Sequence, residues 1–219
     1  MKLSELFKIC DDWHDYQTVG HDVNYKFKEE GNQLYIFFQG SNSTWDWVRN
    51  FMFRAVPYKD MEIPYRVHKG FLSAWKEVED IIIKKISDPK WEDITVVGYS
   101  HGGALAQFAV ECVWYYRHDL RERHMRGYAF EAPRIFAQWR MPKELKKRWE
   151  NLIVIRDGND LVTHCPPIIF GYRNLGSFLK IKGDPSLVKE RWVPKCIKYH
   201  YPQVVYDGLV KMENAEEKK

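Results

Sequence analysis

The sequence predicts an α/β fold with a mostly parallel central sheet, helices on both faces, and antiparallel hairpins at the ends of the sheet. Short apolar runs rich in β-branched and aromatic residues alternate with segments whose apolar residues recur every three or four positions. Such alternation of strands and helices is typical of a parallel sheet covered on both faces. Because the chain has 219 residues and no internal repeat, we expect one domain over residues 1–219.

The first elements are expected to be a helix and a hairpin. Apolar residues at helical spacing predict an amphipathic helix at the start of the chain: Leu3, Leu6, Phe7, Cys10 and Trp13. Alternating residues up to Phe27, a turn at Glu30-Gly31-Asn32 and the apolar run LYIFF then predict a hairpin. This hairpin would supply the antiparallel part of the sheet at its first end.

The remaining elements continue the alternation. In chain order, the pattern predicts a helix over 71–86, a strand over 94–97, a helix from 104, a strand over 128–130, a short helix over 144–149, a strand over 152–155 and a hairpin around 171–181. The polar residues 212–219 are expected to form a frayed tail.

Composition argues against several functional classes. Lys and Arg total 34 against 30 Asp and Glu, which gives a net charge of +4 and no reason to expect a nucleic-acid partner. No apolar run approaches the length of a membrane span. No phosphate-binding glycine fingerprint and no cluster with metal-ligand spacing is present, so we expect no cofactor and no metal.

Cysteines and the first residues bear on the cellular compartment. Four cysteines lie far apart without a CxxC pair, so we expect reduced thiols rather than a zinc site or disulfides: Cys10, Cys112, Cys165 and Cys196. Asp11 and Asp12 stand where a secretory signal needs apolar residues. A cytoplasmic location is therefore favoured.

The stretch ITVVGYSHGGALAQFAVECV, residues 94–113, contains the pattern G-x-S-x-G after a predicted strand and before a predicted helix. A serine in so sharp a turn has a strained backbone, and side chains two positions before and after it would collide. Gly98 and Gly102 remove those side chains. The helix that follows points its positive N-terminal end at the reacting centre, which favours an oxyanion. The pattern therefore predicts Ser100 as a nucleophile.

A serine hydroxyl needs a base to accept its proton and an acid to orient that base. Where this turn occurs, the partners follow in the order serine, acid, histidine. Asp157 and Asp160 both follow a predicted strand and are candidates for the acid. The histidines beyond them are His164, which lies very close to Asp160 in sequence, and His200.

Seven segments in order resemble the class 3 lipases, the family of fungal triacylglycerol lipases: YIFFQGSNSTWDW, VHKGF, VVGYSHGGALA, FEAPR, NDLVTHCPP, FGYRNLG and HYPQVVY. The resemblance covers about residues 35–206 and implies the α/β-hydrolase fold. It implies Ser100 as nucleophile, His200 as base and Asp160 as acid. Asp157 would then cap a loop. Many relatives are secreted, which keeps secretion open.

The resemblance also implies an oxyanion hole and a lid. The oxyanion donors would be Ser41 and the backbone N–H of His101. The lid would span about residues 42–53 and present an apolar face to lipid, with these residues contacting substrate: Trp45, Trp47, Val48 and Phe51.

These expectations together predict a serine hydrolase that cleaves lipid carboxylic esters, foremost acylglycerols, at a lipid–water interface. Two alternatives stay open on the same machinery, a phospholipase of the A1 type and a short-chain carboxylesterase. A third is a non-catalytic lipid-binding module on a hydrolase scaffold.

Overall fold

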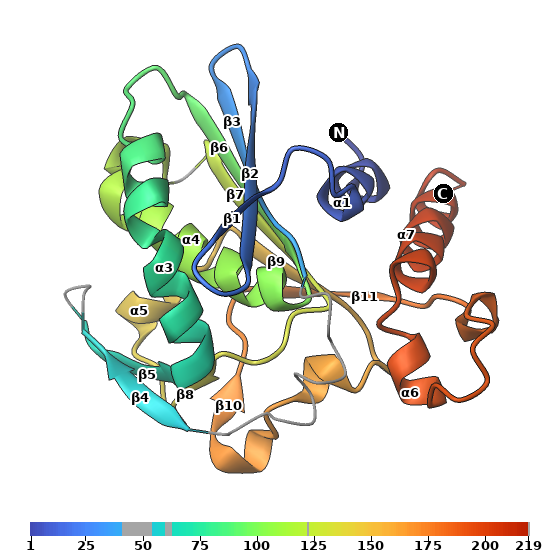
Figure 1. Cartoon of the computed structure of the whole chain (residues 1–219). Helices are drawn as coiled ribbons and strands as arrows, with labels where there is room; N and C mark the ends of the chain where they lie inside the picture. The colour runs from blue at the N-terminus through green and yellow to red at the C-terminus, as the bar shows by residue number, and fades with distance from the viewer. Residues whose placement is uncertain (41–53, 60–62, 122, 219) are drawn as a thin grey trace.

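A seven-stranded sheet forms the centre of the molecule in the computed structural model, which describes residues 1–40, 54–59, 63–121 and 123–218 (Figure 1). Its strand order is β1-β2-β3-β6-β7-β9-β11. The strands are β1 (Gln17–Val19), β2 (Val23–Glu30), β3 (Gln33–Phe38), β6 (Asp93–Tyr99), β7 (Met125–Phe130), β9 (Leu152–Asp157) and β11 (Ser177–Ile181). Neighbours are parallel from β3 to β11, whereas β1, β2 and β3 are antiparallel.

Helices cover both faces of this sheet. Helices α3 (Lys69–Ile86) and α4 (His101–Tyr116) lie on one face, and α1 (Leu3–Asp11) and α7 (Pro202–Glu216) lie on the other (Figure 1). The alternation along β3 explains the two layers, because successive side chains of a strand point to opposite faces. Leu34, Ile36 and Phe38 join the core under α3 and α4, and Tyr35 and Phe37 join the core under α1 and α7.

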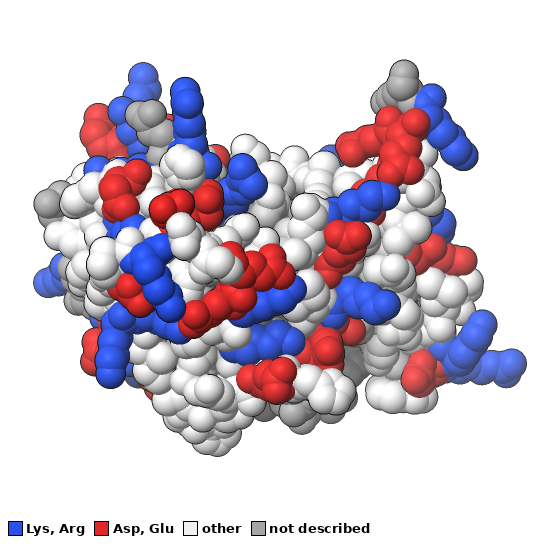
Figure 2. All heavy atoms as spheres, turned by 90° about the horizontal axis from the view of Figure 1, so that it is seen from above, with Lys and Arg blue, Asp and Glu red and all other residues white. Residues whose placement is uncertain are grey.

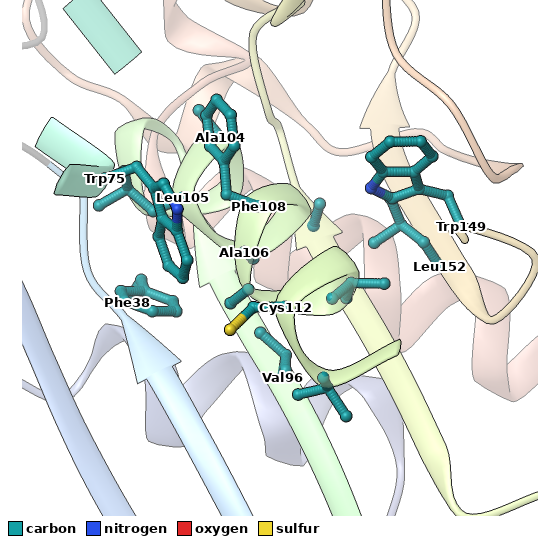
Figure 3. Close-up of a cluster of buried hydrophobic side chains, with 14 of the residues drawn as sticks. Phe38, Trp75, Val96, Ala104, Leu105, Ala106, Phe108, Cys112, Trp149 and Leu152 are labelled. Carbon is teal, nitrogen blue, oxygen red and sulfur yellow. The ribbon is translucent and has the colours of Figure 1, made fainter. Parts of the chain in front are cut away.

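Helix α4 is buried along most of its length and anchors the larger core. All of its residues from His101 to Val113 are buried. Phe108 and Cys112 project from it among Trp75 of α3 and Val96 of β6 (Figure 3). The helix that follows the serine is thus held rigidly against the sheet.

A smaller sheet and several short helices complete the fold. The smaller sheet has the order β10-β8-β5-β4, with β4 (Ala55–Tyr58), β5 (Tyr65–His68), β8 (Phe136–Ala137) and β10 (Tyr172–Arg173). The short helices are η1 (His118–Leu120), α5 (Lys143–Lys147), η2 (Val162–His164), η3 (Ile168–Phe170), η4 (Pro185–Leu187) and α6 (Lys195–Lys198).

The predicted fold class, the first hairpin and the main helices and strands are confirmed, but the hairpin around 171–181 is wrong. Its two strands belong to different sheets, since β10 pairs with β8 and β11 runs parallel to β9. Gly176 lies between them with φ +91°, and a Cβ there would stand 2.5 Å from the carbonyl oxygen of Leu152. This left-handed residue redirects the chain alongside β9.

The residues 212–219 also differ from expectation, because α7 continues to Glu216. The Glu213 carboxylate accepts hydrogen bonds from the Ser4 backbone N–H at 2.9 Å and from the Ser4 hydroxyl at 2.6 Å. The two ends of the chain lie side by side on one face of the sheet (Figure 1). Contact with α1 therefore extends the helix where composition alone predicted fraying.

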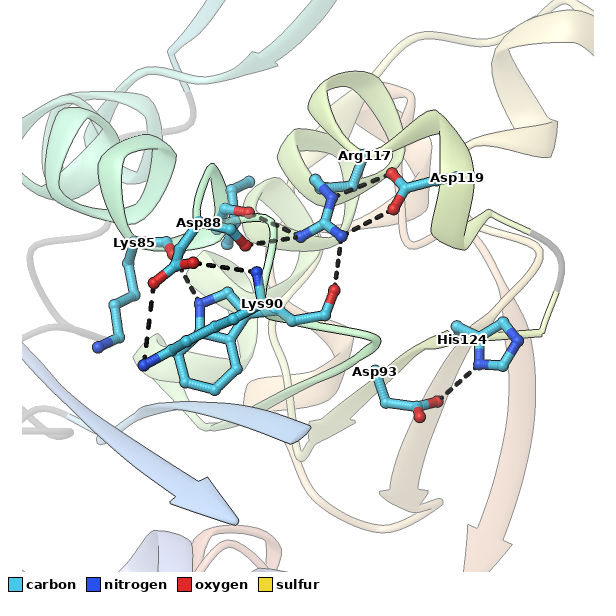
Figure 4. A network of polar contacts seen from close by, with 9 residues as sticks. Lys85, Asp88, Lys90, Asp93, Arg117, Asp119 and His124 are labelled. Atoms are coloured by element: carbon cyan, nitrogen blue, oxygen red, sulfur yellow. Dashed lines mark hydrogen bonds and ion pairs between the residues drawn. The ribbon is translucent and has the colours of Figure 1, made fainter. Parts of the chain in front are cut away.

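Arg117 ties together the ends of the two helices on the other face. Its guanidinium donates to the carbonyl oxygen of Ile86 at 2.9 Å and to that of Trp91 at 2.6 Å, and it pairs with Asp119 at 2.7 Å (Figure 4). Ile86 is the last residue of α3, and Trp91 lies in the loop before β6. The bond to Ile86 satisfies a backbone acceptor that a helix end leaves without a partner.

Acidic and basic side chains are intermingled over the face seen from above (Figure 2). Among the described residues drawn there, this face has no broad region of a single sign that would favour a polyanionic partner. Within the described part of the chain, no helix combines the length and apolarity that a bilayer span requires. All four cysteines are free thiols in the structure.

A buried ion pair beneath α4 predicts a large stability effect. The Arg148 guanidinium lies 2.6 Å from the Glu111 carboxylate, and the two side chains are 2% and 0% exposed. The Tyr65 hydroxyl also donates to Glu111. Burial raises the pKa of Glu111 to about 7 although both partners lower it. Removing one partner leaves the other buried without compensation, so Arg148→Met is expected to lower the free energy of unfolding by about 3 kcal/mol, measured by urea denaturation.

The matched control is the triple variant Tyr65→Phe, Glu111→Leu and Arg148→Met, which removes both charges and also the hydroxyl that donates to Glu111. It is expected to recover most of the lost stability, because an apolar pair leaves no unpaired charge. A single variant that unfolds at the same urea concentration as the parent protein would contradict this account.

Candidate active site

Ser100 forms the turn between β6 and α4. Strand β6 ends at Tyr99 and α4 begins at His101, so one residue carries the whole change of direction. Its backbone has φ 55° and ψ −121°, a conformation that L-residues rarely adopt. The Ser100 N–H donates to the carbonyl oxygen of Phe130 on β7 at 2.9 Å. The residue is 4% exposed and is held where two strands and a helix meet.

The two glycines of the motif are required by close packing. A Cβ on Gly98 would lie 2.1 Å from the carbonyl oxygen of Gly102, and a Cβ on Gly102 would lie 2.2 Å from that of Phe38. Both are backbone atoms that cannot yield. The steric reason that the sequence suggested for these glycines is therefore confirmed.

Three side chains from distant parts of the chain meet at this turn. The hydroxyl of Ser100 lies 2.7 Å from Nε2 of His200, and Nδ1 of the same ring lies 2.6 Å from Oδ2 of Asp160. Asp160 follows β9 and His200 lies between α6 and α7. The tautomer that suits both contacts carries its proton on Nδ1, which leaves Nε2 free to accept the serine proton. The arrangement can remove a proton from Ser100.

Asp160 is completely buried and fixed by its own loop. Its Oδ1 accepts the Val162 backbone N–H at 2.9 Å, and its carbonyl oxygen accepts the Thr163 hydroxyl at 2.9 Å. Because Oδ1 is occupied in this way, Oδ2 faces the imidazole. The loop thus sets the direction of the carboxylate before any substrate arrives.

Tyr99 supports His200, which sequence reasoning did not anticipate. The two rings stack with centroids 5.4 Å apart and planes at 23°, and the Tyr99 hydroxyl donates to the His200 carbonyl oxygen. The signal in the sequence is the alternation along β6. Val97 and Tyr99 point to the face that α7 covers, and α7 closely follows His200.

Asp157 and His164, the other candidates for the acid and the base, make contacts away from the serine. The Asp157 carboxylate accepts the backbone N–H groups of Asn159 and Gly183, each at 3.0 Å, which is a loop-capping role. The ring of His164 contacts the Arg134 guanidinium and the Gly158 carbonyl oxygen, each at 3.1 Å. The structure therefore brings Asp160 and His200, rather than Asp157 and His164, to the serine.

His101 packs beneath the turn. Its ring lies 5.7 Å from that of Phe71, and burial lowers its pKa to about 4. The ring is therefore neutral near pH 7. Its backbone N–H belongs to the first turn of α4, where N–H groups have no partner within the helix. Ser41, the other expected oxyanion donor, lies outside the described residues. So do all the expected lid residues, Trp45, Trp47, Val48 and Phe51.

A second buried carboxyl, that of Glu131, lies beside the acid. One oxygen of Glu131, one oxygen of Asp160 and one ring nitrogen of His200 lie within 4.8 Å of one another. Sequence spacing could not show this group, because its members come from three separate segments. Both ring nitrogens of His200 are already engaged by Ser100 and Asp160, so the group is better explained by hydrogen bonding than by metal ligation.

The fold and this line of three side chains define an α/β-hydrolase of the serine–histidine–aspartate type. Residues 35–170, more than half of the chain, match the family described as lipase (class 3). The chain belongs to the class 3 lipase family, as the sequence segments suggested.

Two curated relatives and one solved structure illustrate the similarity. A lipase of Rhizomucor miehei is 27% identical over 186 residues, 79% of this chain and 48% of the relative. A secreted mono- and diacylglycerol lipase of Fusarium solani is 30% identical over 161 residues, 70% of this chain and 45% of the relative. The solved triacylglyceride lipase of Rhizomucor miehei has a TM-score of 0.67 at 21% identity, over 90% of this chain and 82% of that one. The chain spans about half the length of these curated relatives.

These relatives contradict the expected cytoplasmic location, because the Fusarium solani protein is named as secreted. The expectation depended on Asp11 and Asp12. In the structure, Asp11 is the last residue of α1, whose Leu6 and Phe7 are buried against the sheet. The segment belongs to the folded body, so its polar residues carry no information about export.

Proposed function

We propose that this chain hydrolyses carboxylic esters of acylglycerols through a serine acyl-enzyme. The observation that carries the proposal is the line of contacts from Ser100 to His200 at 2.7 Å and from His200 to Asp160 at 2.6 Å, in a buried strand–helix turn. A neutral serine hydroxyl is a weak nucleophile, and this line supplies the base and the acid that activate it.

The proposed reaction has two halves. The Ser100 oxygen attacks the ester carbonyl carbon while its proton passes to Nε2 of His200, and Asp160 stabilises the resulting imidazolium. The imidazolium then gives that proton to the departing alcohol oxygen as the carbon–oxygen bond breaks, which leaves the acyl group on Ser100. Water, deprotonated by His200, then attacks the acyl carbon. The bond from that carbon to the Ser100 oxygen breaks as this oxygen takes the proton back from His200, which releases the fatty acid.

The oxyanion is proposed to form at the N-terminus of α4. The His101 backbone N–H is one donor, and the positive end of the helix adds to its effect. We assign Ser41 as the second donor and residues 42–53 as the lid, on the resemblance alone. Each well-placed donor contributes about 3 kcal/mol of transition-state stabilisation in sites of this kind.

An exposed apolar segment supports a lipid substrate. Ile168, Ile169 and Phe170 of η3 are 56%, 73% and 54% exposed. Consecutive exposed apolar side chains of this kind mark surfaces that meet lipid or a partner. Strand β10 directly follows η3 in the chain and lies at the lower end of the molecule in Figure 1. Strand β3 runs toward this same end from its turn with β2. The reacting serine lies beyond the same ends of the parallel strands.

A substrate panel tests the proposal. We expect hydrolysis of emulsified mono-, di- and triacylglycerols, with a rate that rises when the ester passes from monomers to droplets, measured by fatty-acid titration. The control substrates are a soluble short-chain p-nitrophenyl ester and phosphatidylcholine vesicles. Preference for the soluble ester would indicate a carboxylesterase, and preferred release of one acyl chain from phosphatidylcholine would indicate a phospholipase.

A further inference from the structure

Glu131 occupies an unusual position at the end of β7. Its side chain is 0% exposed, and its backbone has φ 45°, in the left-handed region. That conformation is less stable than the right-handed one for any residue that has a side chain. Such strain is retained where the surrounding structure holds it, often at functional sites. A glycine would avoid the cost, so the carboxyl group itself calls for an explanation.

The contacts of Glu131 leave one oxygen without a donor. Oε1 accepts the Asp157 backbone N–H at 2.7 Å. Oε2 is buried and has no hydrogen-bond partner among the described residues. A buried oxygen that stays unpaired destabilises the folded state. An added proton would turn Oε2 from an acceptor into a donor, and the neighbouring acceptor group is the carboxylate of Asp160.

The donors around the three neighbouring carboxyls decide where the negative charge resides. Asp160 accepts from the Val162 N–H and from the His200 ring, and Asp157 accepts from two backbone N–H groups. Glu131 accepts from one. Hydrogen bonds to the charged form of a carboxyl stabilise it, and Glu131 accepts the fewest of the three, so the proton resides on Glu131.

Burial and these two anions raise the pKa of Glu131 well above its usual range, with burial the larger cause. Four titratable groups surround Glu131. They are Asp157 of β9, Asp160 of the loop after β9, Tyr99 of β6, and His200, which lies between α6 and α7. Burial also raises the pKa of Tyr99, which stays neutral. The cation that forms here during the reaction is the imidazolium of His200, and Asp160 is its direct partner.

We propose that Glu131 is a positioning residue, which carries a proton and donates it in a hydrogen bond to Asp160, so that the Asp160 carboxylate stays aimed at Nδ1 of His200. This inference rests on the proposed function, since Asp160 acts there as the orienting acid. A neutral carboxylic acid suits the role because one oxygen accepts the Asp157 N–H while the other donates. An ionised Glu131 would instead repel Asp160.

Two substitutions separate the proton from the backbone strain. Glu131→Gln keeps an acceptor for Asp157 and a donor for Asp160, whereas Glu131→Gly removes both and also relieves the strain. Asp15→Gly is the matched control, because Asp15 is exposed and has φ 65°. We expect Glu131→Gly to lower kcat about 10- to 100-fold with KM changed less than about threefold, and Glu131→Gln to recover most of that loss.

Two further measurements distinguish a role of Glu131 in orienting Asp160 from a role in stabilising the fold alone. The acid limb of kcat/KM, which reports His200, is expected at the same pH in Glu131→Gln and the parent protein, because a neutral group replaces a neutral group. The low-field proton resonance of His200 Nδ1–H is expected to shift in Glu131→Gly and to stay in place in Asp15→Gly. This resonance requires no turnover.

The proposal is overturned if kcat of Glu131→Gly stays within about twofold of the parent protein, or if the resonance does not move. It is also overturned if Glu131→Gln shifts the acid limb to lower pH, since that would mean a negative charge had been removed from beside the imidazolium. If the parent protein cleaves no ester, the proposed function fails. The shift of the His200 Nδ1–H resonance in Glu131→Gly then tests the positioning role of Glu131 by itself.

Discussion

Replacing Ser100 with alanine is expected to lower kcat/KM for a p-nitrophenyl ester by about 10⁴-fold or more. The reason is that the substitution leaves His200 and Asp160 in place with no oxygen for them to activate. The side-chain hydroxyl contacts Nε2 of His200 at 2.7 Å, and the strained backbone is the same for alanine as for serine. We therefore expect the variant to fold and to unfold thermally close to the parent protein. Steady-state kinetics measure the loss of turnover, and a fluorophosphonate probe measures the loss of labelling at Ser100.

The control for this variant is Ser186→Ala, since Ser186 is an exposed serine on η4. It is expected to keep both turnover and labelling. Loss of labelling in Ser100→Ala alone would identify the nucleophile and exclude a non-catalytic lipid-binding scaffold. Turnover that persists in Ser100→Ala would refute the mechanism, and a parent protein that the probe does not label would favour the non-catalytic alternative.

Local sequence patterns predicted the elements that carry this site. Gly98 and Gly102 follow from the geometry of a serine turn, and in the structure a Cβ on either glycine would collide with a backbone carbonyl. The continuous apolar runs of β3 and β6 likewise follow from strands that are buried on both faces of a sheet. These features depend on neighbours in sequence, so they can be inferred without knowing where the rest of the chain lies.

Contacts between distant segments could not be inferred in the same way. The choice between Asp157 and Asp160 depends on which loop atoms each carboxylate finds, and Gly183 and Val162 supply those atoms from different segments. The sequence alone left that choice open, and only the resemblance favoured Asp160. The buried position of Glu131 is another such case, because FEAPR gives no sign that its glutamate lies beside an acid from a loop much later in the sequence.

The smaller sheet was missed for a related reason. Strands β8 and β10 have two residues each. Strand β5 pairs with β8 through one pair of residues, Val67 and Phe136. Runs of this length carry no period that a pattern search can detect. They form because the main sheet and α3 bring their flanking segments together, and the turn at Gly176 then separates β10 from β11.

Replacing Asp160 with asparagine is expected to lower kcat by about 10³- to 10⁴-fold while changing KM little. The Val162 N–H at 2.9 Å requires an oxygen acceptor, so the amide oxygen is held there and the amide NH₂ faces the imidazole. That NH₂ donates to Nδ1 and selects the tautomer with its proton on Nε2. The ring then presents a donor to Ser100 and cannot accept its proton. Steady-state kinetics on the p-nitrophenyl ester measure the loss.

The same substitution at Asp157 is the control that decides between the two acids. Asp157 accepts backbone N–H groups on both oxygens, so Asp157→Asn places an NH₂ group against a backbone donor and is expected to lower the free energy of unfolding by about 1–3 kcal/mol. It leaves the His200–Asp160 contact in place, and kcat should stay within about tenfold of the parent value. A larger loss of kcat in Asp157→Asn than in Asp160→Asn would exclude Asp160 as the acid. The substitution by asparagine reverses the tautomer of His200 only at the residue that orients this ring.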